Sequence, residues 1–397
     1  MIVICSSKTI SPEKRLFDKS DYTIFTSNLI DAKVSAKFLF YRMCGFMSKK
    51  FILAVSFILS FVVLIPAQSQ KVMDVYDRGY DLQIAGRIDE ALAEYDKVIQ
   101  LAPNFAKVYQ NRANIYLEKA VADKALADYS KYIQLKPGDW QGYYNRGIAY
   151  YQFGDYDNSV IDFDKTLLLN PNMIEAHINR GNAKKMKNDL VGAFADYDKA
   201  VTLSPLTYEG YYNRGAANFE LKKYDAAMVD YSRVIAIRPK MADAYRMRGA
   251  IYSIRKEYDK SITDLDRAIS LKPDEAEYYY QLGTAKKEKG DLPGAIAALS
   301  ESIRLAPDNA DIFFARGSIF ETGEPAKAIA DFTRALELNP QYAVIYARRG
   351  LLLLAAGKKA EAAKDLAMAI KLDESLRAGY EPFLKKAGGS VPTKKAQ

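Results

Sequence analysis

Three residue types recur together along the chain and could do chemistry: an asparagine, an arginine and a glycine. The triplet Asn-Arg-Gly occurs at Asn145–Gly147, Asn179–Gly181 and Asn213–Gly215, and Asn111–Ala113 is a close variant. A side-chain amide can donate to a peptide carbonyl and accept from a peptide N–H. A guanidinium presents a fixed fork of N–H donors that matches a carboxylate. The triplet therefore indicates non-covalent binding rather than bond-making chemistry.

An acidic residue follows the arginine at a fixed distance. Sixteen residues separate the two charges in successive units, and both charges vanish together where Leu282 and Ala298 replace them. This joint loss favours pairing within one unit. We predict the structural ion pairs Arg112–Asp128, Arg146–Asp162, Arg180–Asp196, Arg214–Asp230 and Arg248–Asp264. The alternative is that these arginines form a cationic strip for an acidic ligand.

Composition excludes several classes of function. The 397 residues are 49% hydrophobic and 27% charged, which is typical of a globular protein with a large core. The net charge is +8, but both signs alternate along the chain, so we expect no nucleic-acid partner. The chain has one histidine and shows no phosphate-binding loop, metal-ligand cluster or nucleophile–histidine–acid set. We predict that it is not an enzyme and binds no metal and no cofactor.

The N-terminal part reads as a leader. Residues 47–69 combine Lys49 and Lys50, an apolar run from Phe51 to Ile65, and small residues around Ala67 and Ser69, as in a secretory signal peptide. The run is short for a membrane span, which needs about 20 residues. We expect cleavage after Ser69, with an uncleaved membrane anchor as the alternative. Residues 1–46 show no clear periodicity, so we predict that they are unstructured and that translation begins at Met47.

From residue 72 onward the chain repeats itself with a period of 34 residues. The small residue that closes the triplet keeps this period, and so does a proline near the end of each unit. Apolar residues recur at three- and four-residue spacing in both halves of a unit, which predicts two amphipathic helices. The small residues recur at Gly79, Ala113, Gly147, Gly181, Gly215, Gly249, Gly283, Gly317 and, one residue early, Gly350. The prolines recur at Pro103, Pro137, Pro171, Pro205, Pro239, Pro273, Pro307 and Pro340.

These glycine, alanine, aromatic and proline positions resemble the tetratricopeptide repeat family over residues 72–376. The resemblance implies an all-α fold: a right-handed α-solenoid superhelix of nine helix-turn-helix repeats plus a C-terminal capping helix. The expected repeats span 72–105, 106–139, 140–173, 174–207, 208–241, 242–275, 276–309, 310–342 and 343–376. We expect the capping helix at 376–387 and a flexible tail at 388–397. His177 takes the place of an aromatic residue found in other units, so we interpret it as a packing residue.

The same resemblance gives the asparagine a role. In tetratricopeptide proteins this phase of the first helix lines the concave groove, and the superhelical domain of O-linked N-acetylglucosamine transferase has a similar asparagine ladder that grips ligand backbone. By that resemblance the candidate peptide-binding residues are Asn111, Asn145, Asn179 and Asn213, with Gln281 as an extension. The alternative is that each amide bonds within its own helix or faces water.

The function that follows is a non-catalytic protein–protein interaction scaffold that binds an extended peptide or protein segment in the concave groove. The expected partner is therefore a protein or a peptide. The signal peptide predicts an exported protein, periplasmic or extracellular. The alternative is a membrane-anchored assembly factor held by an uncleaved N-terminal helix, and only that form would contact a membrane.

Overall fold

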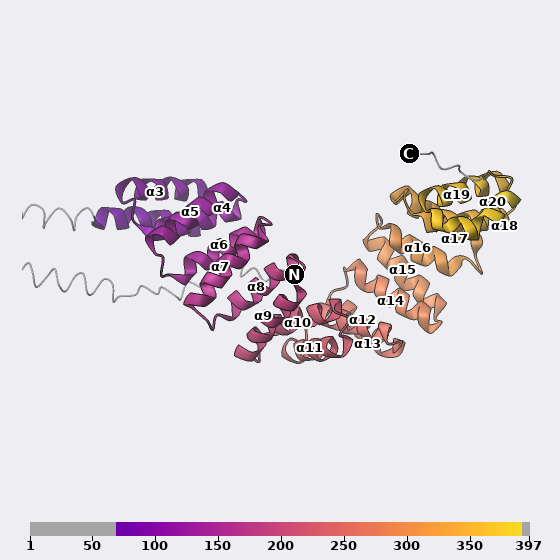
Figure 1. Cartoon of the computed structure of the whole chain (residues 1–397), viewed down its shortest axis with the longest axis horizontal. Coiled ribbons are helices and arrows are strands. Elements are labelled where there is room, and N and C mark those ends of the chain that lie inside the picture. The colour runs from indigo at the N-terminus through magenta and orange to yellow at the C-terminus, as the bar shows by residue number, and fades with distance from the viewer. Residues whose placement is uncertain (1–68, 391–397) are drawn as a thin grey trace, which may run out of the picture. The chain divides into compact units, whose positions relative to one another are not determined.

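The computed structural model describes residues 69–390 (Figure 1). The predicted start at Met47, nearly all of the signal peptide and residues 391–397 of the tail lie outside this range. Every regular element within the range is a helix, and the helices pack in consecutive pairs, so the predicted all-α solenoid is confirmed. None of the helices in this range is long and apolar enough to span a bilayer.

The chain divides into two compact units, and the first ends at Leu203. Its described part begins with a helix over residues 69–84. Seven helices follow: α3 (Ile88–Leu101), α4 (Ala106–Glu118), α5 (Ala122–Leu135), α6 (Trp140–Gln152), α7 (Tyr156–Leu169), α8 (Ile174–Met186) and α9 (Leu190–Leu203). Each even-numbered helix pairs with the next odd-numbered one, as α4 does with α5. These pairs correspond to the first four predicted repeats.

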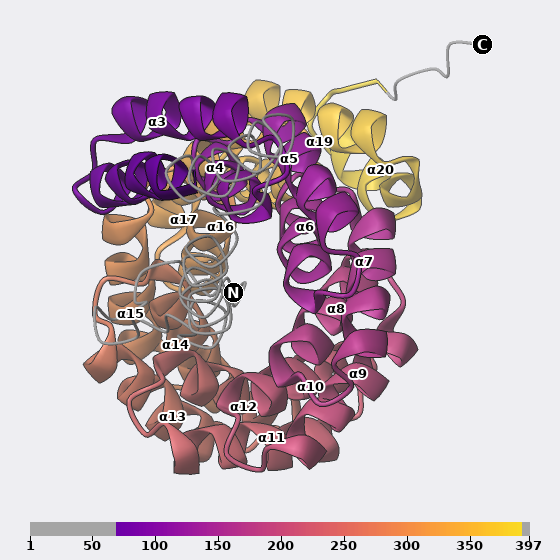
Figure 2. The ribbon, with the colours of Figure 1, turned by 90° about the vertical axis from the view of Figure 1, so that its left-hand side faces the viewer.

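The second unit begins at Ser204 and contains the remaining helix pairs. They are α10 (Tyr208–Glu220) with α11 (Tyr224–Ile237), α12 (Ala242–Ile254) with α13 (Tyr258–Leu271), α14 (Ala276–Lys289) with α15 (Leu292–Leu305), α16 (Ala310–Phe320) with α17 (Pro325–Leu338), and α18 (Ala343–Ala355) with α19 (Lys359–Leu372). Both views show α14 lying against α15 (Figure 1, Figure 2). The C-terminal elements are the 3-10 helix η1 (Glu374–Leu376) and α20 (Arg377–Lys386).

In most helix pairs, one residue in the left-handed backbone conformation makes the turn between the two helices. Glycine takes this conformation at Gly86, Gly154, Gly290 and Gly357, and other residues do so at Ala120, Asn188, Lys222 and Lys256. This conformation ends the first helix and lets the second fold back against it. In the pair α16–α17 the first helix has 11 residues, fewer than the 13 of α4 or the 14 of α14, and the turn contains no left-handed residue. The missing residue of this repeat is therefore the one that makes the turn elsewhere.

The core of each pair forms where the triplet glycine faces a large residue of the second helix. A Cβ added to Gly181 would lie 2.6 Å from Cε1 of Tyr197, closer than real side chains approach. Because that position has no side chain, the helices come close and the ring of Tyr197 is fully buried. The equivalent fully buried residues are Tyr95, Tyr129, Phe163, Tyr231, Leu265, Leu299, Phe332 and Leu366.

The last pair is covered by α20. Its Leu384 is fully buried against Leu366 and Ile370 of α19. A solenoid leaves the apolar face of its terminal repeat open unless another element covers it. The short helix α20 therefore completes the core of the second unit.

Candidate functional site

The predicted arginine–aspartate pairs have bidentate geometry within single repeats. Nε of Arg146 lies 2.7 Å from one carboxylate oxygen of Asp162, and the second donor lies 2.8 Å from the other oxygen. Arg248 and Asp264 repeat this arrangement at 2.7 and 2.8 Å. The other three predicted pairs are also in contact: Arg112 with Asp128, Arg180 with Asp196 and Arg214 with Asp230. The aspartates are buried, whereas the guanidiniums remain about one-fifth exposed.

The remaining nitrogen of the guanidinium reaches the preceding repeat, which the sequence reasoning missed. Nη1 of Arg146 donates to Ser130 Oγ at 2.9 Å, and Nη1 of Arg316 donates to Ser300 Oγ at 2.9 Å. In repeat four the acceptor is Asp164, 2.7 Å from Arg180. Each acceptor lies sixteen residues before its arginine. One arginine thus joins three helices from two repeats.

Repeat seven replaces this polar contact with an apolar one. Leu282 and Ala298, which stand where the two charges would be, are buried with Leu265 and Ala285. A buried ion pair and an apolar contact of similar volume are close alternatives in stability, whereas an unpaired buried charge is costly. The joint change keeps the repeat packed and explains why the sequence never loses one charge alone.

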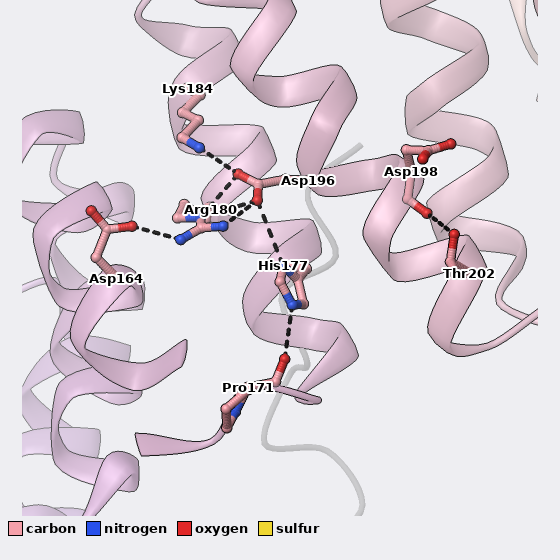
Figure 3. A network of polar contacts seen from close by, with 8 residues as sticks. All are labelled: Asp164, Pro171, His177, Arg180, Lys184, Asp196, Asp198 and Thr202. Atoms are coloured by element: carbon pink, nitrogen blue, oxygen red, sulfur yellow. Dashed lines mark hydrogen bonds and ion pairs between the residues drawn. The ribbon is translucent and has the colours of Figure 1, made fainter. Parts of the chain in front are cut away.

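Asp196 is the most heavily paired of these carboxylates (Figure 3). Besides Arg180, the ammonium of Lys184 lies 2.8 Å from Oδ2, and Nδ1 of His177 lies 3.6 Å from Oδ1. Burial opposes ionisation, but the neighbouring His177, Arg180 and Lys184 outweigh it and lower the pKa of Asp196 to about 2. Among the described residues Asp162 has Arg146 alone as a cationic partner, and burial raises the pKa of that carboxyl. The same motif therefore carries opposite pKa shifts in adjacent repeats.

His177 takes over a packing role that tyrosine has elsewhere. Its Nε2 lies 3.0 Å from the carbonyl oxygen of Pro171, six residues earlier. The hydroxyls of Tyr109 and Tyr143 donate to the carbonyls of Pro103 and Pro137 at the same spacing. The imidazole is buried and holds the start of its helix to the preceding turn, as those phenols do.

Two of the candidate groove asparagines are bonded to tyrosines of the preceding repeat. Nδ2 of Asn111 lies 2.8 Å from the hydroxyl of Tyr76 and 3.4 Å from that of Tyr95. Nδ2 of Asn179 lies 3.0 Å from the hydroxyl of Tyr144, and Asn179 is 8% exposed. Both amide nitrogens are therefore engaged inside the protein.

The other two asparagines keep free donors. Asn145 is half-buried, and its side chain makes no hydrogen bond to any residue within 69–390. In Asn213 the amide nitrogen is buried and has no partner in the described part of the chain. Such a donor is unusual in a folded protein, where nearly all buried polar atoms are satisfied.

Gln281 is intermediate between these two states. Its amide nitrogen donates to Glu277 at 2.6 Å on the same helix, while its oxygen is buried without a partner among the described residues. The amide is thus already oriented by its own helix, and only an acceptor is left over.

Bonded and free asparagine amides alternate from repeat to repeat, and the residue just before the triplet position indicates which is which. Tyrosine stands just before the triplet position in odd-numbered repeats, at Tyr76 and Tyr144, whereas repeats two and four have Gln110 and Ile178 there. Each tyrosine reaches the asparagine 35 residues later. An asparagine that follows a tyrosine-bearing repeat is bonded, and one that follows Gln110 or Ile178 is free.

Comparison with protein families and solved structures gives a consistent result. Models of the tetratricopeptide repeat match residues 76–139, 140–173, 208–241, 280–343 and 320–376, and a TPR repeat model matches 249–290. Together these matches span more than half of the chain. No curated protein matches the sequence.

Several solved structures are similar over part of the chain. A MamA protein is 28% identical over 43% of this chain and 94% of its own, with a TM-score of 0.40. YrrB, a TPR protein with an unusual peptide-binding site, is 23% identical over 49% of this chain and 97% of its own, with a TM-score of 0.41. A tetratricopeptide repeat protein from Parabacteroides merdae is 19% identical over 63% and 99%, with a TM-score of 0.49.

Proposed function

The chain belongs to the tetratricopeptide repeat family, and we propose that it is a non-catalytic scaffold that binds an extended peptide segment of a partner protein along its asparagine positions. The family supports a role in protein–protein interaction. The proposal goes beyond the family in two respects: peptide binding at the asparagine positions and the absence of catalysis.

The observation that carries the proposal is the unpaired amide of Asn213. Its donor is buried, and leaving a buried donor unsatisfied costs about 1–3 kcal/mol. A peptide carbonyl would satisfy it once the Asn213 side chain turns outward, because less than 1 Å² of the nitrogen is exposed. Asn145 offers the same amide, half-buried and unbonded in the described part of the chain. We therefore assign backbone recognition mainly to Asn145 in the first unit and to Asn213 in the second unit.

Asn111 and Asn179 have a secondary role in this proposal. Their nitrogens are held by Tyr76 and Tyr144, so that only an amide oxygen remains to accept a peptide N–H. The tyrosines fix the direction of these side chains, which lowers the entropy lost on binding. Gln281 would extend the row as a further acceptor.

A peptide-binding measurement tests this assignment. Peptides selected from a random library on the full chain would be titrated against Asn145→Ala, Asn213→Ala and the double variant. We expect the double variant to weaken binding about tenfold or more, since each neutral hydrogen bond contributes about 1 kcal/mol. Asn158→Ala is the matched control, because Asn158 is exposed on α7 and its side chain bonds to Asp155, the cap of the same helix. Equal affinities for wild type and the double variant would refute the assignment.

We also propose that the protein is exported, with the membrane-anchored assembly factor as the alternative. The support is the sequence pattern of residues 47–69, which lie outside the described residues except for Ser69. Mass spectrometry of the mature N-terminus separates the two forms. Gln70 as the first residue would support export, whereas retention of Phe51–Ile65 would support the anchor.

A further inference from the structure

A ring lies beside the guanidinium in several repeats, four residues after the arginine. The ring of Tyr150 has its centroid 5.7 Å from Cζ of Arg146. Two other repeats show the same contact, Arg112 with Tyr116 at 5.8 Å and Arg316 with Phe320 at 6.0 Å. The ring fills the space beside the ion pair and gains a cation–π contact.

The last repeat lacks this ring and has a cavity at the corresponding place. Leu353 stands four residues after Arg349, where three other repeats have Tyr116, Tyr150 and Phe320. A cavity of about 290 Å³ opens there. Its lining comes from α17, α18 and α19 and consists of Ile329, Thr333, Arg349, Leu353, Glu361, Lys364 and Asp365. None of these residues belongs to the asparagine row.

The cavity keeps its shape because the guanidinium at its wall is held in place. Arg349 donates to both carboxylate oxygens of Asp365, at 2.7 and 2.9 Å, and to Thr333 at 3.0 Å. Tyr346 lies against the guanidinium, with 5.8 Å between Cζ and the ring centroid. With each of its three nitrogens bonded, the Arg349 guanidinium is held at the wall of the cavity.

Two of the other repeats without a ring at this position have a polar side chain there that bonds to the aspartate. Lys184 and Asn218 stand there in repeats four and five and donate to Asp196 and Asp230, at 2.8 and 3.2 Å. Leu353 has no polar atom with which to make such a bond. The last repeat therefore combines an ion pair with neither a ring nor a polar substitute, as repeat one also does with Arg78, Glu94 and Leu82.

The last repeat also differs from other repeats in the charge of one residue at the edge of the cavity. A lysine lies over the ring in three repeats: Lys124 over Tyr116, Lys260 over Tyr252 and Lys327 over Phe320. Glu361 occupies the corresponding position in the last repeat, just before the small residue Ala362. A carboxylate does not favour the negative face of a ring but accepts readily from an O–H at its edge.

We propose that this cavity, bounded by Arg349, Leu353 and Glu361, accepts a tyrosine side chain of a partner protein. The ring would take the place that Tyr150 has beside Arg146, and its hydroxyl would donate to Glu361. The volume suffices, because a cavity of about 150 Å³ already holds benzene. The proposal adds a second docking point to the scaffold and does not depend on the asparagine row.

The test uses N-acetyl-tyrosinamide as the probe and methyl NMR of the full chain as the readout. We expect the probe to shift the methyl signals of Leu353 and Ile329 with millimolar affinity, and N-acetyl-leucinamide to have little effect. Leu353→Tyr, which supplies the ring internally, and Ile329→Phe, which fills the cavity from α17, should each weaken binding at least fivefold. Glu361→Gln should weaken binding of the tyrosine probe more than that of N-acetyl-phenylalaninamide.

A matched variant is expected to create the same kind of cavity in another repeat. Tyr150→Leu in repeat three removes a ring while keeping Arg146 and Asp162, so it should add a second site for the probe. The proposal fails if wild-type protein shows no shift at Leu353 and Ile329. It fails equally if both filling variants bind the probe as wild type does.

Discussion

At the scale of single residues, the arginine does more than pair with one aspartate. Arg248 donates through Nε and Nη2 to Asp264 on its own repeat and through Nη1 to Ser232 on the preceding repeat. A guanidinium can do this because its five donors lie in one rigid plane, and lysine could not replace it. The interface between repeats thus has a directional polar contact in addition to its apolar core.

Removing one partner of such an ion pair should lower the free energy of unfolding more than replacing both partners with apolar residues. We expect Asp264→Ala to destabilise α12 and α13 by about 3 kcal/mol, because it leaves Arg248 without its main partner. The double variant Arg248→Leu with Asp264→Ala copies Leu282 and Ala298 of repeat seven, so it should cost clearly less. Native-state hydrogen exchange of the two helices measures both. A double variant less stable than Asp264→Ala alone would contradict the interpretation that Leu282 and Ala298 replace the ion pair in repeat seven.

Asp196 should make stability depend on acid pH. Its folded pKa of about 2 lies below the unfolded value of about 3.9, so its carboxylate stabilises the native state above pH 4. That contribution is lost as the pH falls from about 4 to 2. Asp196→Asn should therefore be about 2 kcal/mol less stable than wild type at pH 6, with the difference shrinking towards pH 2. Urea denaturation across this range measures the difference, with Asp123→Asn, on the exposed start of α5, as control.

At the scale of elements, the turn inside each helix pair sets the local geometry. In every described pair except α16–α17, the turn residue has a positive φ whether it is glycine, as in Gly154 at +81°, or a bulkier residue, as in Lys222 at +57°. A side chain in this conformation costs about 1–2 kcal/mol relative to the right-handed helix, and glycine avoids that cost. The pairing of the helices evidently outweighs the cost at Ala120, Asn188, Lys222 and Lys256.

Exchanges at this position should shift stability in opposite directions. Lys222→Gly should stabilise the pair α10–α11 by about 0.5 kcal/mol, because the removed strain exceeds the added chain entropy of the unfolded state. Gly154→Ala should destabilise α6–α7 by about 1 kcal/mol. Thermal unfolding followed by circular dichroism shows both shifts. A stabilising Gly154→Ala would mean that the left-handed conformation does not determine the outcome.

At the scale of the whole molecule, stability is distributed along a line of neighbours. Within each compact unit, most contacts join helices that are adjacent in sequence, and the main contacts of α20 are with η1, α18 and α19. A change in one repeat is therefore felt most by the repeats beside it. This arrangement allows the asparagine positions in one repeat to be altered without collapse of the rest.

Removal of the cap contact should have a local effect. Leu384→Ala opens a cavity against Leu366 and Ile370, and such changes cost about 2–5 kcal/mol. We expect faster hydrogen exchange in α18, α19 and α20, with α10 to α13 unchanged. Glu381→Ala on the same helix is the control, since its ion pair with Lys385 lies at the surface. Uniformly faster exchange throughout the second unit would contradict this local view.

The sequence by itself determined the repeat period, the helix pairs and the all-α class. These follow from the periodic glycine, alanine, aromatic and proline residues, because each repeat meets the same local constraints. It also indicated Arg146 with Asp162 and its equivalents as partners, since two charges that disappear together must lie together. These features depend on residues at fixed short spacings, which a single chain displays many times over.

Only the tertiary structure decided which asparagines have free amides and where a ring is missing. Asn111 and Asn145 look alike in the sequence, but Tyr76 of the preceding repeat engages Asn111 and no described residue engages Asn145. Leu353 reads as an ordinary core residue until three helices place a cavity around it. The reason is that hydrogen bonds and voids depend on which side chains from neighbouring repeats meet, and the period of one repeat does not contain that information.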